Sequence, residues 1–517
     1  MNIIFFVLIL LCCSLTNGYG AVYYVKDTGN DALSGLSDED AWKTINKVNK
    51  FQFSSGDTLC LKRGSVFKDA TILSPNVDNF TFQDYGIGSK PLLDGDIVQP
   101  ISIKPNSTIK NLAIVNVDIS GQDWKSSKES NVYVSNIQGL IIDGIIGDGH
   151  KGGNSALGKT AITVHGCEGS VIVKNCVLNN WGSSSLLSSR TDFMGIAIIE
   201  QLDGNYIIEN NIIFNIGSDA IHLYKCSASG LVKSNKLYNS GENCIDVKGS
   251  SNVVIDGNEF FRTSDFYGSG GSGVGDYPTH IDVHEGGPGV KSLNVRVFGN
   301  YFHDGDAAGV RIARTEHVSI EGNLFKNIAT NVVIGNSSVE TRVFDNFFIN
   351  SNIRLSLSSN KDASCILENN NGPGTYIYEN TIYNQSGTGI NLILLEANKE
   401  THIYRNVVYN ANFVPESFCF YSIAGLGIVH LYDNCWFKVS DPSRAINYGS
   451  RIYGSVNQSA WNLTSPGDIF VDPLLTDPLH GDYTLQSTTP CKTNGKMWGA
   501  KPFSGLLPSL ELKLRIL

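Results

Sequence analysis

Titratable side chains recur at matching positions in four short apolar segments between residues 219 and 314. The segments read DAIHLYK from Asp219, NCIDVKG from Asn243, THIDVHE from Thr279 and AGVRIAR from Ala308. Aligned on their apolar residues, they give a first column of His222, Asp246, Asp282 and Arg311 and a second column of Tyr224, Lys248 and His284. Such groups transfer protons and stabilise developing charge. The two columns are therefore the first candidates for chemistry in this sequence.

The spacing of these residues predicts β-strands that present both columns on one surface. The positions between them hold apolar pairs, namely Ile221/Leu223, Ile245/Val247, Ile281/Val283 and Val310/Ile312. Side chains alternate between the two faces of a strand, so the apolar pairs should face inward and the columns outward. Neighbouring strands lie about 4.8 Å apart, which would bring the members of each column together. Stacked Asp246 and Asp282 would repel each other without a basic neighbour, so both a functional site and a salt-bridged surface patch fit the pattern.

A repeating unit explains how such strands come to lie side by side. Residues typical of strands, an Asn, two or three apolar residues and a turn recur, as in VIVKNCVLNN from Val171 and VSIEGNLFKN from Val318. The first Asn of each unit stands at position 175, 210, 235, 258, 300, 323, 346, 380 and 406. These repeats predict coils of about 22–36 residues that stack into an all-β parallel β-helix, a single-stranded solenoid. The recurring Asn should form a structural ladder of side-chain amides inside one bend.

Composition and charge limit the classes of molecule that this protein is expected to bind. The chain of 517 residues is 41% hydrophobic and carries a formal net charge of −10. An acidic chain lacks the basic face of a sequence-independent nucleic-acid binder, so no nucleic-acid partner is expected. A local basic patch would still attract an anionic substrate. The 11 cysteines include no CxxC pair, so buried thiols are expected in place of a zinc ribbon.

The N-terminus resembles a signal peptide. Residues 3–13 read IIFFVLILLCC, an apolar run that is too short to span a membrane and suits the core of a secretory signal. Cleavage is expected after Gly20. No later segment is long and apolar enough to span a bilayer. We therefore expect a secreted, extracellular protein without a membrane span.

Four further segments resemble one known superfamily. They are YYVKDTGNDALSGLSDEDAWKTINK from Tyr23, SSGDTLCLKRGSVF from Ser54, DYGIGSKPLLDGD from Asp84 and DIFVDPLLTDPLHGDYTLQ from Asp468. They resemble the opening strand and capping helix, the first coils and the C-terminal segment of the pectate lyase-like right-handed parallel β-helix superfamily. The superfamily contains lyases, hydrolases, epimerases and non-catalytic proteins, so the resemblance implies the fold more than the reaction.

The resemblance also implies a division of the chain. Residues 1–20 would be the signal peptide and residues 21–100 the N-terminal helical cap with the first coils. Residues 101–440 would form the β-helix core with groove-forming loops, and residues 441–517 the C-terminal coil and cap.

The reaction that the resemblance implies first is cleavage of a uronic-acid-containing polysaccharide by β-elimination. Such an enzyme binds an anionic polysaccharide and is expected to be a monomer. Lys248 resembles the strand lysine that serves as base in some pectate lyases, and His284 is the rival base because its ordinary pKa lies near neutrality. Arg311 could pair with the substrate carboxylate. Asp246 and Asp282 could hold Ca²⁺, whose ligands are oxygens.

Three other functions fit the same residues. Asp246 and Asp282 could be the carboxylate pair of a glycoside hydrolase. A C5-epimerase would begin with the same proton abstraction as a lyase. A non-catalytic glycan-binding β-helix would use the columns for recognition alone.

Further candidate substrate-binding residues surround the columns. Loops at 181–194 and 262–279 interrupt the repeat beside them, and we expect these loops to form groove walls. The candidates are His222 and Tyr224 within the columns, Glu285 and Arg314 at the rim, and Trp181, Phe266 and Tyr267 as aromatic platforms for sugar rings.

Overall fold

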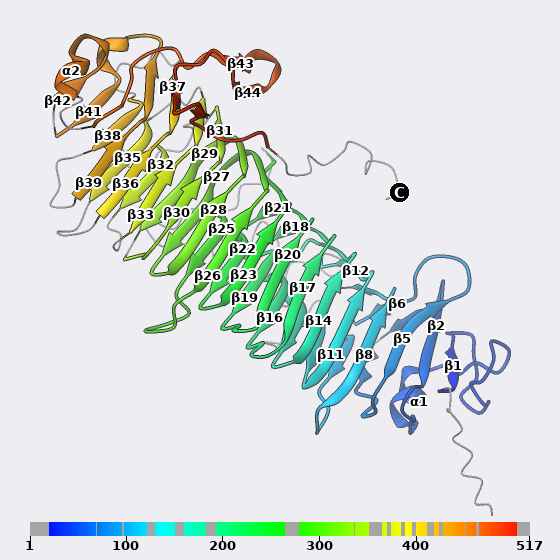
Figure 1. Ribbon diagram of the computed structural model, residues 1–517. Helices are drawn as coiled ribbons and strands as arrows, with labels where there is room; N and C mark the ends of the chain where they lie inside the picture. Colours follow the sequence, from blue (N-terminus) through cyan, green and yellow to red (C-terminus); the bar gives the residue numbers. More distant parts are fainter. Residues whose placement is uncertain are drawn as a thin grey trace, which may run out of the picture.

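The computed structural model is an elongated solenoid of parallel strands (Figure 1). It describes residues 20–68, 70–95, 98–120, 130–149, 160–181, 193–263, 279–335, 337–350, 364–369, 374–383, 388–394, 400–410, 418–422, 428–449, 451–461 and 465–503. Residues 1–19, most of the expected signal peptide, lie outside this set. In the described part, no helix is long and apolar enough to cross a membrane.

Most complete coils contribute three strands. One coil consists of β23 (Ser251–Asp256), β24 (Glu259–Phe261) and β25 (Thr279–His284). Strands equivalent to β23 form a 15-stranded sheet from β1 (Val22–Val25) to β39 (Ile428–Tyr432). Strands equivalent to β24 form one stack and strands equivalent to β25 form a second stack, and both belong to one 27-stranded sheet. The two stacks join where β27 (Tyr301–Ala313) runs as one long strand that pairs with both β24 and β25.

The interior follows the alternation that the sequence predicts. The inward apolar pairs belong to β19 (Ile221–Tyr224), β22 (Asn243–Lys248), β25 and β27, and all eight side chains have an exposed fraction of 0%. They are part of one continuous core that extends along the solenoid. Burial of each such side chain stabilises the fold by about 1.5–3 kcal/mol. This apolar core fixes which residues of each strand face outward.

The predicted Asn ladder exists, with two of its members assigned wrongly. Its rungs are Asn211, Asn235, Asn258, Asn300, Asn323, Asn346, Asn380, Asn406 and Asn434, and it ends on Asp468. Each rung donates its side-chain amide to the side-chain oxygen of the next rung. Asn175 and Asn210 instead adopt a left-handed backbone at the preceding turn position, with φ of 54° and 56°. Asn suits both positions, so the sequence alone could not separate them.

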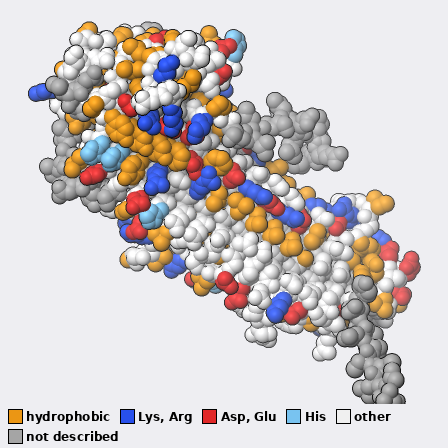
Figure 2. Space-filling view, viewed as in Figure 1, with side chains coloured by type: hydrophobic (Ala, Val, Ile, Leu, Met, Phe, Trp, Pro, Cys, Tyr) orange, Lys and Arg blue, Asp and Glu red, His pale blue; other side chains and the backbone are white. Residues whose placement is uncertain are grey.

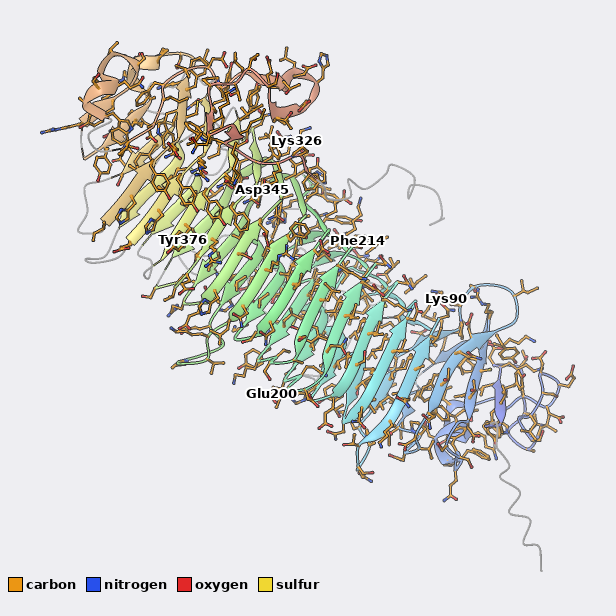
Figure 3. All side chains as sticks on the ribbon, in the orientation of Figure 1. Lys90, Glu200, Phe214, Lys326, Asp345 and Tyr376 are labelled. Atoms are coloured by element: carbon orange, nitrogen blue, oxygen red, sulfur yellow. The ribbon has the colours of Figure 1, made fainter. Side chains whose placement is uncertain are left out.

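The two ends of the solenoid differ. At the N-terminal end, the short helix α1 (Ile45–Lys50) buries Ile45 and Val48, and the hydroxyl of Thr44 caps it by accepting from the backbone N–H of Lys47. At the C-terminal end, the chain turns back over earlier coils. There Lys496 pairs with Glu379 at 3.0 Å, and Lys501 pairs with Asp345, a residue labelled in Figure 3, at 3.1 Å.

Eight cysteines of the described part are buried thiols, as expected. Cys60, Cys167, Cys176, Cys226, Cys244, Cys419, Cys435 and Cys491 are all buried and unbridged.

Candidate functional site

The structure brings together the two columns that the sequence predicts. Strands β19, β22, β25 and β27 are consecutive parallel neighbours of one sheet. Their register pairs His222 with Asp246, Asp246 with Asp282, and Asp282 with Arg311. The same register pairs Tyr224 with Lys248 and Lys248 with His284. The predicted alignment is therefore confirmed, while the roles of these residues remain predictions.

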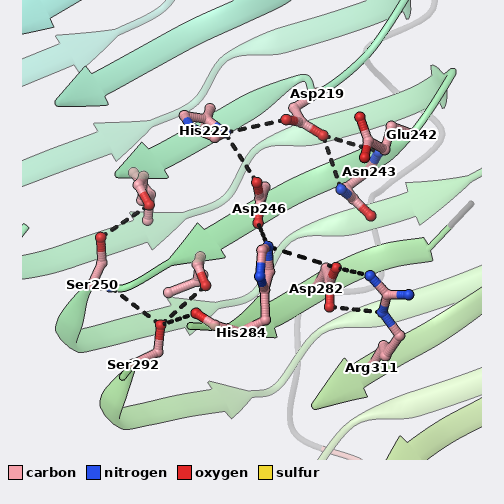
Figure 4. A network of polar contacts seen from close by, with 12 residues as sticks. Asp219, His222, Glu242, Asn243, Asp246, Ser250, Asp282, His284, Ser292 and Arg311 are labelled. Carbon is pink, nitrogen blue, oxygen red and sulfur yellow. Dashed lines mark hydrogen bonds and ion pairs between the residues drawn. The ribbon is translucent and has the colours of Figure 1, made fainter. Parts of the chain in front are cut away.

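The first column is a chain of alternating charges (Figure 4). Nδ1 of His222 lies 3.0 Å from Oδ2 of Asp246, and Nε2 of His284 donates to Oδ1 of the same carboxylate at 3.0 Å. Nε2 of His284 also lies 3.9 Å from Oδ2 of Asp282. Arg311 donates to both oxygens of Asp282, with Nε 3.0 Å from Oδ1. Each carboxylate is thus enclosed by basic side chains, which removes the repulsion between Asp246 and Asp282.

Although these side chains point outward, the acidic groups are almost fully buried. The exposed fractions are 4% for Asp246, 1% for Asp282 and 8% for His222. Burial lowers the pKa of His222, but hydrogen bonds and charge attraction from Asp219 and Asp246 outweigh it and raise the pKa to about 10. Burial raises the pKa of Asp246, but hydrogen bonds from His222 and His284 outweigh it and hold the pKa well below its usual value. Both groups are therefore charged at neutral pH.

Asp219 is a member of this network that the sequence reasoning missed. Its Oδ2 lies 3.2 Å from Nδ1 of His222, and its Oδ1 accepts from the backbone and side-chain nitrogens of Asn243 at 3.2 and 2.9 Å. Burial raises the pKa of Asp219 to about 7. A signal was present in the aligned segments, because Asp219, Asn243 and Thr279 occupy equivalent positions three residues before the first column.

His284 is the partly exposed end of the buried network. Its side chain has an exposed fraction of 23%, against 5% for Asp246. Burial lowers the pKa of His284, whereas the hydrogen bond to Asp246 and the charges of Asp246 and Asp282 raise it, and the net shift is upward. The hydroxyl of Ser292 donates to the carbonyl of His284 at 2.7 Å and so fixes the end of β25. With Nε2–H held by Asp246, a neutral His284 carries its lone pair on Nδ1.

Lys248 and Tyr224 complete the second column beside His284. Both are half-buried. Strand register places Lys248 beside His284 and Tyr224 beside Lys248. The ring of Tyr224 stacks on His222 with centroids 5.9 Å apart, and Nζ of Lys225 lies 4.8 Å from its centroid. An ammonium group and a phenol therefore line the same surface as the imidazole.

The structure places the remaining predicted binding residues in different environments. Glu285 and Arg314 pair with each other at 2.9 Å at the ends of β25 and β27. The expectation that Trp181 is a sugar platform is wrong, because the ring is 2% exposed and packs in the core over Gly147, where a Cβ would meet it at 2.7 Å. Tyr267 and Phe266 lie outside the described residues, as do most of the loops at 181–194 and 262–279.

The carboxylates do not fit a calcium site. Ca²⁺ takes six to eight oxygen ligands. Both oxygens of Asp246 already bond to histidines, and both oxygens of Asp282 bond to Arg311. A calcium ion would have to displace these basic partners, so we derive no step through a metal.

A family model agrees with the fold class that the strand order shows. The model described as "Right handed beta helix region" matches residues 197–371, a range that contains both columns. The chain is a right-handed parallel β-helix. This β-helix agrees with the superfamily that the terminal segments resemble. No curated protein matches the sequence.

Solved structures with similar folds include carbohydrate-active enzymes. The GH136 lacto-N-biosidase from Eubacterium ramulus is 13% identical with a TM-score of 0.37, and the match covers 79% of this chain and 65% of that chain. The GH87 alpha-1,3-glucanase from Streptomyces thermodiastaticus is 11% identical with a TM-score of 0.45, covering 73% and 62%. An alginate lyase from a Paenibacillus species is 14% identical with a TM-score of 0.36, covering 58% and 93%. These activities are those of the named proteins.

Proposed function

We propose that this β-helix protein is a secreted lyase that cleaves a uronic-acid-containing polysaccharide by β-elimination. The observation that carries the proposal is the pair of His284 and Asp246. A buried carboxylate that holds one imidazole nitrogen fixes the tautomer and stabilises the imidazolium that forms when the other nitrogen takes a proton. Such a pair at the edge of a surface column is an arrangement for general-base catalysis.

The proposed reaction uses the second column. Nδ1 of His284 removes the proton at C5 of the uronic acid, and the electron pair forms the double bond between C4 and C5. The bond between C4 and the glycosidic oxygen breaks, and that oxygen takes a proton from Tyr224 or from water. Lys248, next to His284 in register, neutralises the substrate carboxylate and so favours loss of the C5 proton. Arg311 has a structural role in this scheme, because it neutralises Asp282.

The geometry favours this reaction over glycoside hydrolysis by Asp246 and Asp282. A hydrolytic carboxylate pair must contact the glycosidic bond and a water or nucleophile. Here the side chains of Asp246 and Asp282 are at most 5% exposed and are bonded to basic side chains. C5-epimerisation shares the proton abstraction by His284 and differs only in the fate of the carbanion.

A panel of polymers separates these reactions. The purified protein is incubated with pectate, alginate, ulvan and glycosaminoglycans while ultraviolet absorbance of unsaturated ends and reducing sugar are followed. The proposal expects both signals to rise together on one uronic-acid polymer. Reducing sugar without unsaturated ends would indicate a hydrolase, and binding without any product would indicate a glycan-binding protein. In D₂O, deuterium incorporation at C5 without cleavage would indicate an epimerase.

A further inference from the structure

A separate cluster of metal-ligand side chains lies on the 15-stranded sheet, near the C-terminal end of the solenoid. Glu400 and His402 belong to β36 (Glu400–Tyr404), and His430 belongs to β39. One ligand atom from each of the three residues lies within 4.8 Å of the others. The candidate lyase site is on the other sheet and in earlier coils, so this cluster is distinct from it.

Strand register explains why these residues meet. β36 and β39 are parallel neighbours that pair His402 with His430, and Glu400 lies two residues before His402 on the same face. The rings of His402 and His430 stack with centroids 4.4 Å apart. On its other side His402 stacks on Tyr376, which Figure 3 labels, at 4.9 Å. The imidazoles are therefore held side by side by the sheet.

The distances within the cluster suit a shared ion better than direct hydrogen bonds. Oε2 of Glu400 lies 3.6 Å from Nε2 of His402 and 3.9 Å from Nε2 of His430. Hydrogen bonds between such atoms measure about 2.7–3.2 Å. Tetrahedral zinc holds its nitrogen and oxygen ligands at about 2.0–2.2 Å, which places the ligand atoms about 3.3 Å from each other. Binding one ion would require rotation of the stacked imidazoles and the Glu400 side chain, so that all three ligand atoms point at the same position.

The cluster also has space for a further ligand. Both histidines line an open hollow of about 600 Å³, together with Val429, Leu431, Tyr432 and Pro466. Figure 2 shows histidine and acidic side chains gathered over β36 and β39 beside an apolar surface.

We propose that Glu400, His402 and His430 bind a divalent transition metal, zinc in particular, with a coordination position open toward the hollow. Two imidazoles and one carboxylate are ligands of the kind that zinc prefers, whereas calcium requires mainly oxygen. The open position would take water or an oxygen ligand such as a sugar hydroxyl or carboxylate. This inference does not depend on the lyase proposal.

The test is metal binding by the full secreted chain, without a histidine tag and after removal of metals. Isothermal titration with zinc chloride should show one site, and cobalt(II) bound there should give the visible absorption of a tetrahedral N/O site. Removal of a residue that only hydrogen-bonds to a metal ligand weakens metal binding by roughly tenfold or more. His402→Ala and His430→Ala each remove a ligand itself, so each should weaken zinc binding by at least that factor. Glu400→Gln should weaken it less and change the cobalt spectrum.

Two matched variants control for zinc bound elsewhere. His480→Ala removes an exposed histidine that is paired with Asp477, and His284→Gln removes a histidine of the candidate lyase site. Both should bind zinc like the wild type. The proposal is overturned if the wild type shows no site, if His402→Ala and His430→Ala bind normally while their thermal unfolding is unchanged, or if binding is lost only in His284→Gln.

Discussion

At the scale of single residues, the imidazole of His284 takes its orientation from a carboxylate that is itself buried. Asp246 bonds to two histidines, and its hydrogen bond raises the pKa of His284. A raised pKa makes His284 a stronger base but leaves it protonated over more of the acidic range. Activity of the proposed lyase should therefore increase as the pH rises through the His284 pKa, because the neutral imidazole is the active form.

Replacing Asp246 tests this coupling. Asp246→Asn removes the charge that favours the imidazolium, so the His284 pKa should fall and the acidic limb of the kcat/KM profile should shift to lower pH. The maximal rate should also fall, because the amide no longer stabilises the protonated intermediate. A pH–rate series on both proteins measures this. An acidic limb that stays in place would show that Asp246 does not set the basicity of the catalytic group.

His222 makes a prediction about stability. Its pKa of about 10 in the folded protein exceeds the usual 6.5, so its stabilising effect is complete below 6.5 and is lost as the pH rises toward 10. Asp219 is ionised above about pH 7, so deprotonation of His222 near pH 10 leaves the carboxylates of Asp219 and Asp246 buried without a cation between them. The melting temperature should fall between pH 7 and pH 10, and it should fall less in His222→Asn. Equal losses in the two proteins would contradict this role.

The sequence predicted which residues form the two columns but not how deeply their side chains are buried. Alternation with a period of two fixed which residues share a face, and the apolar pairs fixed the alignment. Whether Asp282 is exposed depends on how Arg311 and His284 fold over it, which the spacing does not contain. Trp181 was misjudged for the same reason, because a residue that begins a loop can still turn its ring into the core.

At the scale of elements, the Asn ladder holds consecutive bends together. Asn323 accepts from both the backbone nitrogen and the side-chain nitrogen of Asn300 at 2.9 and 3.0 Å. The ladder was predictable because its rungs recur once per coil. The coil in which the ladder starts was not predictable, because Val117, Ile145 and Cys176 occupy the equivalent buried position in earlier coils and carry no side-chain amide.

Removal of one rung should destabilise the coil around it. Asn323→Ala leaves the buried N–H of Asn300 without an acceptor, which should lower the free energy of unfolding by about 1–3 kcal/mol. Lys326→Ala, an exposed change in the same coil, should stay within about 0.5 kcal/mol of the wild type. Urea denaturation measures both. Similar stabilities for the two variants would show that the ladder does not stabilise the bend.

At the scale of the whole molecule, the C-terminal segment contacts coils that lie far from it in the sequence. Lys496 and Lys501 reach Glu379 and Asp345, which lie 117 and 156 residues earlier, and the backbone nitrogen of Ala500 donates to Thr381 at 3.0 Å. Contacts at such separations leave no periodic signal, so the sequence could predict a C-terminal cap but not its path.

Truncation tests whether the C-terminal segment stabilises the coils that it contacts. A chain that ends at residue 490 loses the contacts of Lys496, Ala500 and Lys501, and should melt at a lower temperature with earlier loss of the C-terminal coils in hydrogen exchange. A chain that ends at residue 503 keeps every contact described for this segment and should melt like the full chain. Unchanged exchange in the shorter chain would show that the segment stabilises nothing.

In the proposed reaction, His284 removes a proton from carbon in a uronic-acid polymer. The most direct measurement is the rate at which unsaturated ends appear, compared between the wild type and His284→Gln on the same polymer. General-base catalysis contributes about 10²–10⁴-fold, so the variant should be at least about 100-fold slower while its melting temperature and polymer binding stay close to the wild type. Equal rates of unsaturated-end formation in the two proteins would contradict the account.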